Sequence, residues 1–307
     1  MTTKKPSVIK SHFIPQGYLR NFLVTKDSLY VLNKKYGRIR ATSTAGVGYQ
    51  PDFYLVDTID EKNSLEVEKS FSQIESTCIP LLRKLNTTAD ITNSERADVA
   101  IYIALQYGRT PHARSRMDKV ATIVGTNEIK QRMADAVNDP TKYDEMVADL
   151  SKSNPGVIIP TREKLIEWIL KPGPLANIKI DNGTYVKLFF EHAWRIAEGL
   201  LDAQWVVYRA PKGSSFVTSD NPIVLKLARE LKEYETLGIL MPGMVRYFPL
   251  SSTHCLVIHG NASDRKIRRE VVSKQVVRAI NSLTTSQANL YVISGSKALL
   301  ESLKASS

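Results

Sequence analysis

Residues 11–22 read SHFIPQGYLRNF, and this stretch carries more local structural information than any other in the chain. A proline fixes its own φ, favours an extended residue before it and is well tolerated in the first turn of a helix. We therefore expect an extended segment up to Ile14 and a short helix from Pro15 to about Leu23. Its large apolar side chains would form one buried face, made by Tyr18, Leu19, Phe22 and Leu23.

Three polar side chains of this stretch are predicted to converge. Gln16 and Arg20 are four residues apart and share another face of the expected helix, and His12 lies just before its start. A histidine, an amide and an arginine at one point suit either proton transfer or the binding of an anion. The alternative is structural, with Arg20 and Arg109 pairing with carboxylates to hold the N-terminal stretch on the core.

The same stretch resembles the N-terminal signature of a bacterial family catalogued as domain of unknown function 4238, which reads His-aromatic-Val/Ile-Pro-Gln-x-Tyr-Leu-Arg/Lys-x-Phe. Gly17 departs from it, because a bulky residue is expected there, and this bears on local packing only. Three later segments resemble the family in order and spacing: Arg109-Thr110-Pro111, FVTSDNP at 216–222 and FPLS at 248–251. The resemblance spans nearly the whole chain and implies no activity.

Composition indicates an ordinary globular protein. The chain has 307 residues, of which 43% are hydrophobic and 24% charged. We expect a single domain, 1–307, with an N-terminal motif and hairpin (1–60), a helical region (61–203) and a sheet with terminal helices (204–307). No apolar run approaches the roughly 18–20 residues of a membrane helix, and no signal peptide is recognisable. With two distant cysteines, Cys78 and Cys255, these features predict reduced thiols, no membrane association and a cytoplasmic location.

The net charge of +11 favours contact with polyanions, and nucleic acid is the usual one inside a bacterium. The alternative is a basic surface that only aids solubility. An expected hairpin, 28–33 with 37–42, gathers Lys34, Lys35, Arg38 and Arg40. It is either a basic finger for phosphates or a solvated edge whose lysines oppose aggregation.

Hydrophobic periodicity predicts an α+β fold, with a helical middle region packed on a mostly antiparallel C-terminal sheet. Helices are expected at about 64–85 with a kink or break at Pro80, from Thr92 or Asn93 to Arg109, and at 113–150, 162–170, 182–203 and 264–283. Strands are expected at 28–33, 37–42, 51–56, 204–209, 215–218, 245–248, 254–259 and 290–293. The strands 204–209 and 215–218 are predicted to pair as a hairpin.

Two functions of different class follow. The first is a nucleic-acid-acting protein, a nuclease-like effector of a bacterial or phage-linked system, with Mg²⁺ or Mn²⁺ as candidate cofactor. In it His12, Gln16 and Asp220 are catalytic and Arg20 and Arg109 bind the anion, with support from Glu75, Gln106, Ser219 and Asn221. The second is a non-catalytic binding module for a nucleotide, a nucleic acid or an acidic protein. A turn-forming role for 218–222 is the structural alternative, and no established nuclease, Walker or zinc motif is present.

Overall fold

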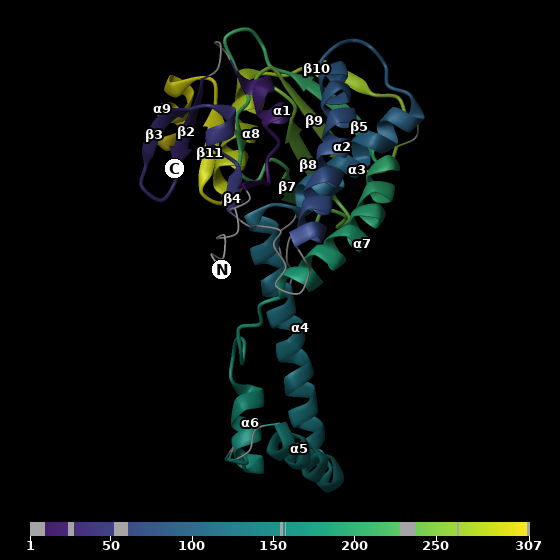
Figure 1. Ribbon diagram of the computed structural model, residues 1–307, viewed down its shortest axis with the longest axis vertical. Helices are drawn as coiled ribbons and strands as arrows, with labels where there is room; N and C mark the ends of the chain where they lie inside the picture. Colours follow the sequence, from purple (N-terminus) through teal and green to yellow (C-terminus); the bar gives the residue numbers. More distant parts are fainter. Residues whose placement is uncertain are drawn as a thin grey trace, which may run out of the picture. The chain divides into compact units, whose positions relative to one another are not determined.

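The computed structural model describes residues 10–23, 28–51, 61–153, 156, 158–227, 238–262 and 264–305 (Figure 1). The chain divides into two compact units, one made of Met1–Arg114 with Asp181–Ser307 and the other of Ser115–Ile180. The boundaries of the second unit both fall inside the region 61–203 that was expected to be helical. None of the helices in the described residues is long and apolar enough to cross a membrane.

The first unit has the predicted α+β architecture, and its larger sheet is mostly antiparallel. Five strands lie in the order β10-β5-β9-β8-β7 (Figure 1). Their bounds are Gln204–Arg209 (β5), Val224–Leu227 (β7), Met244–Pro249 (β8), His254–His259 (β9) and Arg268–Val271 (β10). All neighbours are antiparallel except β10, which pairs parallel with β5. The strand β7 was not predicted.

The smaller sheet confirms the predicted N-terminal hairpin and joins it to the end of the chain. Its order is β3-β2-β11-β6, with bounds Leu29–Asn33 (β2), Arg38–Thr42 (β3), Thr218–Ser219 (β6) and Tyr291–Ser294 (β11). Gly37 has a φ of 61° in the hairpin turn, a conformation that glycine adopts without strain. A separate pair, Lys10–His12 (β1) and Tyr49–Pro51 (β4), carries the start of the N-terminal motif. The rest of the expected strand 51–56 lies outside the described residues.

The helices of this unit are Gln16–Leu19 (α1), Glu61–Leu85 (α2), Asn93–Gly108 (α3), Asn182–Leu201 (α7), Lys274–Gln287 (α8) and Lys297–Lys304 (α9), with 3₁₀ turns at Arg20–Phe22 and Thr44–Gly46. The helices α2, α3 and α7 begin and end close to their predicted bounds, and the predicted helix of the N-terminal motif is a short α-helix followed by a 3₁₀ turn. Thr92 caps α3 through a capping box with Glu95. The helix α2 continues through Pro80, so the break expected there does not occur. Pro80 is exposed, so the carbonyl that loses its hydrogen bond there lies on the solvent side of the helix.

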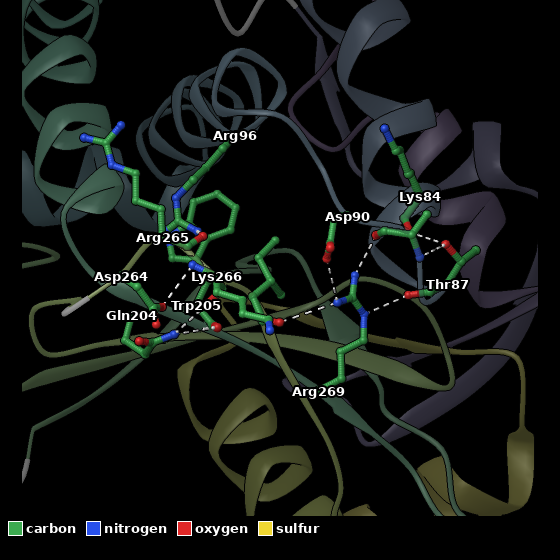
Figure 2. A network of polar contacts seen from close by, with 12 residues as sticks. Lys84, Thr87, Asp90, Arg96, Gln204, Trp205, Asp264, Arg265, Lys266 and Arg269 are labelled. Atoms are coloured by element: carbon green, nitrogen blue, oxygen red, sulfur yellow. Dashed lines mark hydrogen bonds and ion pairs between the residues drawn. The ribbon is translucent and has the colours of Figure 1, made fainter.

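The main core lies between the five-stranded sheet and the helices α2, α3 and α7, and the N-terminal motif contributes to it. Arg96 of α3 is buried in this core, with its guanidinium 4.2 Å from the ring centre of Trp205. It donates hydrogen bonds to the backbone carbonyls of Ala203 (2.8 Å) and Arg265 (3.2 Å) (Figure 2). A buried cation is thus held by carbonyl oxygens and an aromatic face.

Two predictions about the last third of the chain are wrong. The basic stretch 264–283 is not one helix, since its first part forms β10 beside β5 and only α8 is helical. The segment 215–218 does not pair with β5. Instead Phe216 donates a backbone hydrogen bond to Ser252, and β6 pairs with β11 of the other sheet.

The second unit is helical, as expected for most of its length. It contains most of α4 (Pro111–Asn138), together with α5 (Pro140–Ser153) and α6 (Arg162–Leu170). The expected helix 113–150 is therefore two helices, divided at Asp139. Thr161 caps α6, the predicted helix 162–170, by accepting a hydrogen bond from the backbone of Lys164. Thr122 holds the returning chain by two hydrogen bonds with the backbone of Ile178.

Candidate functional site

A cleft of roughly 550 Å³ lies between the N-terminal motif and α2. This volume is within the range of about 300–1,000 Å³ that is usual for ligand sites. One wall is the N-terminal motif. The other is one face of α2, whose lining residues recur every three to four positions along the helix. The lining residues are His12, Pro15, Gln16, Gly17, Arg20, Phe71, Ser72, Glu75, Ser76, Ile79, Pro80 and Arg83.

The predicted apolar face of the motif is buried, except that Leu23 is only partly buried, and it anchors the cleft wall. Tyr18, Leu19 and Phe22 are fully buried. The Tyr18 hydroxyl donates a 2.6 Å hydrogen bond to the Pro249 carbonyl and lies 2.8 Å from the Thr218 hydroxyl oxygen. These contacts join three of the four sequence segments that carry the family resemblance, so the motif is fixed to both sheets.

The predicted polar trio lines one cleft. His12, at the end of β1, is half-buried, with its ring centre 5.6 Å from that of Tyr49. Gln16 opens α1, and its Oε1 lies 3.5 Å from the Thr44 hydroxyl. Arg20 is exposed one helical turn further on. The structure therefore brings these three side chains to the same cavity, which is what their spacing indicated.

Glu75 and Arg109 form the ion pair that the structural alternative proposed. Arg109 is 2% exposed, and its Nη1 is 2.8 Å from Glu75 Oε1. Its Nε and Nη2 both donate to Oε1 of Gln106, at 2.9 and 2.7 Å, and Gln106 Nε2 donates to the Phe13 carbonyl. Arg109 does not line the cleft. Its position supports a role in holding the motif, not the direct anion contact that was predicted.

Arg83 is a cleft residue that the sequence interpretation missed. It is exposed, and its Nε donates a 3.1 Å hydrogen bond to the side-chain oxygen of Asn21. The available signal was its spacing, because Ser76, Pro80 and Arg83 follow one another at intervals of four and three on α2.

Asp220 lies apart from the cleft lining and is almost fully buried. Its carboxylate accepts hydrogen bonds from the backbone N–H groups of Asn289 (2.8 Å), Leu290 (2.6 Å) and Tyr291 (2.9 Å). Burial raises its pKa to about 6, although those bonds favour the ionised form. The structure does not bring it to His12 and Gln16, as the catalytic assignment required.

Ser219 and Asn221, the predicted supporting residues, complete the turn around Asp220. The Ser219 hydroxyl donates to the Asn221 carbonyl at 2.8 Å and accepts from its backbone N–H at 3.1 Å. The Asn221 side chain donates to the Gln287 carbonyl. These contacts match the turn-forming alternative.

The described residues hold no group of three or more His, Cys, Asp or Glu side chains arranged to bind a metal ion. The two cysteines are both buried and unpaired. Burial raises the pKa of the Cys78 thiol to about 12 and that of Cys255 further still, so both thiols are protonated at neutral pH.

Comparison with known proteins agrees with the motifs. A family model described as "Protein of unknown function (DUF4238)" matches residues 10–298. No curated protein and no solved structure matches the chain. The matched range includes the cleft, both sheets and the second unit. The chain belongs to the DUF4238 family.

Proposed function

We propose that this protein binds nucleic acid, holding phosphate groups in the cleft between the N-terminal motif and α2. The observation that carries the proposal is the charge balance of the cleft. Arg20 and Arg83 are both exposed there, and His12 lies at the same cavity. Glu75 is the one carboxylate among the described lining residues, and the ion pair with Arg109 compensates its charge.

The chemistry of arginine supports phosphate as the ligand group. A guanidinium presents a planar fork of donors that matches two phosphate oxygens, and it stays charged at every physiological pH. Long-range attraction from a chain of net charge +11 would add to these contacts. An apolar ligand is disfavoured, because the two arginines would then lose water without gaining a partner.

Cleavage of the bound strand is a second proposal, and the position of His12 favours it. A histidine can take or give a proton near neutral pH, and an arginine beside it can stabilise charge on a phosphate in the transition state. Gln16 would position the phosphate or a water molecule. Asp220 has no part in this version of the nuclease hypothesis.

The binding test uses fluorescence anisotropy with labelled single- and double-stranded DNA and RNA over a range of salt concentrations. For a single strand, the slope of log K against log salt is about −0.7 per phosphate contacted, so Arg20→Ala/Arg83→Ala should make it about 1.4 less negative. The matched control is Lys297→Ala/Lys304→Ala, an equal charge loss at exposed positions of α9. An unchanged slope in the cleft variant, or an equal change in the control, would contradict phosphate binding in this cleft.

The cleavage test incubates the same nucleic acids with the protein and Mg²⁺, Mn²⁺ or EDTA, and resolves the products on a gel. His12→Gln should abolish cleavage while leaving the anisotropy titration nearly unchanged. Binding without any cleavage by the wild-type protein would instead support the non-catalytic module.

A further inference from the structure

A second cleft, of roughly 720 Å³, lies at the β10 edge of the five-stranded sheet. Its walls are the segment that follows α2, the strand β10, and the loops after β5 and before β9. Arg209 and Lys212 are exposed in it, and Arg269 and His254 are partly buried. The cleft is thus basic, with Glu270 as the one carboxylate among its described lining residues.

The hydrogen bonds of Arg269 hold this second cleft in shape. Its guanidinium donates to the carbonyls of Thr87 (2.9 Å) and Ala89 (2.7 Å), and it lies 3.4 Å from a carboxylate oxygen of Asp90 (Figure 2). The segment after α2 is therefore tied to the sheet edge. On the other side, a tight turn with Gly213 at a φ of 81° presents Lys212.

The electrostatic environment of His254 reports the positive character of the cleft. Burial lowers the pKa of His254, and the charges of Arg209 and Arg269 lower it further. Its Nδ1 lies 2.9 Å from the Thr253 hydroxyl oxygen, which orients the ring. An anion placed near these groups would be attracted to the cleft.

Neighbouring residues line the two clefts on two walls, and the hydrogen bond from Arg83 to Asn21 joins these walls between the clefts. On the helix wall, Arg83 lines the first cleft, and Asn86, whose backbone N–H bonds to the Arg83 carbonyl, lines the second. On the opposite wall, Asn21 follows Arg20 of the first cleft, and its carbonyl accepts from the backbone of Ser252 at 3.3 Å. Residues 253 and 254, which come next, line the second cleft.

We infer that the two clefts form one track for a single strand of nucleic acid, running from His12 to Lys212; this inference rests on the proposed function. From Ser72 to Leu85 the helix rises about 20 Å, at about 1.5 Å per residue. At about 3.4 Å per stacked nucleotide, that distance corresponds to roughly six nucleotides. A basic groove of this kind is how proteins follow a single-stranded backbone.

The experiment compares labelled oligodeoxycytidylates of four and twelve nucleotides, since the shorter one fills one cleft and the longer one spans both. In Arg209→Ala/Lys212→Ala, affinity for the twelve-mer should fall about tenfold or more, and affinity for the four-mer about twofold at most. Arg20→Ala/Arg83→Ala should weaken both. The control Lys297→Ala/Lys304→Ala should leave the ratio between the two oligonucleotides at its wild-type value.

Four results would overturn the track. Three of them are an equal loss for both lengths in Arg209→Ala/Lys212→Ala, binding of a twelve-pair duplex as tight as that of the single strand, and binding of polyglutamate with the same dependence on the four arginine and lysine positions. The fourth is tight four-mer binding with no gain at twelve nucleotides, which would refute only the track. A wild-type protein that binds neither oligonucleotide at low salt would refute the proposed function itself.

Discussion

Asp220→Ala is expected to destabilise the protein by about 3 kcal/mol at neutral pH. The Asp220 side chain is 1% exposed and accepts hydrogen bonds from three backbone N–H groups. The substitution leaves these donors without their acceptor. At about 2 kcal/mol for each unsatisfied donor, this costs about 6 kcal/mol. Part of this loss is offset, because the wild-type protein must ionise a buried carboxylate at neutral pH and the variant does not. The rise in the pKa of Asp220 from 3.8 to about 6 corresponds to a cost of about 3 kcal/mol for that ionisation.

The same balance predicts the pH dependence of the loss. Because the folded-state pKa of Asp220 lies above its unfolded value, this group contributes more stability below pH 4 and loses it as the pH rises through about 6. The destabilisation by Asp220→Ala should therefore grow from about 3 kcal/mol at pH 7 toward about 6 kcal/mol near pH 4. Urea unfolding of both proteins across this range measures the difference.

Asp264→Ala is the matched control for this substitution. Its carboxylate is exposed and accepts one backbone hydrogen bond, from Lys266 at 3.1 Å. Its removal should change the free energy of unfolding by no more than about 0.5 kcal/mol. A loss below about 1 kcal/mol for Asp220→Ala at pH 7, or a loss that shrinks toward pH 4, would refute the reasoning.

Three further substitutions test the supports of the cleft by the same unfolding assay. Arg109→Met should cost about 3 kcal/mol, because it leaves Glu75 without its buried partner; a neutral result would contradict the structural role. Thr92→Ala should cost about 1 kcal/mol through loss of the α3 capping box, and Thr92→Ser should recover most of it. Gly48→Ala should cost about 2 kcal/mol, since Gly48 has a φ of 76° and an added Cβ would lie 2.9 Å from Ile14; retained stability would show that this turn can rearrange.

Local signals in the sequence were enough to predict most helices and the first hairpin. The caps at Thr92 and Thr161 mark helix starts, and Gly37 marks the turn of the β2–β3 hairpin. Pairing between distant segments was not predictable in the same way. Residues 268–271 form a strand because β5 is beside them, and nothing in their own basic pattern distinguishes that strand from the helix that follows.

In the candidate site too, local spacing was predictable from the sequence and contacts between distant segments were not. The convergence of His12, Gln16 and Arg20 follows from one helical turn after a proline, so spacing alone predicted it. The role of Asp220 could not be predicted, because its hydrogen-bond donors lie some seventy residues later, in the segment that leads into β11. A strand-end carboxylate has the same local sequence whether it faces a ligand or a neighbouring loop.

The order of the smaller sheet has a consequence for synthesis on the ribosome. The hairpin β2–β3 forms early in the chain, yet the other edge of β2 pairs with β11 near the end, where Tyr291 faces Asn33. At about 5–20 residues per second, that edge stays open for some tens of seconds after the hairpin emerges. During this interval the strand is a template for wrong pairing. Nascent chains stalled before β11 should therefore depend on holdase chaperones, which the completed chain would no longer need.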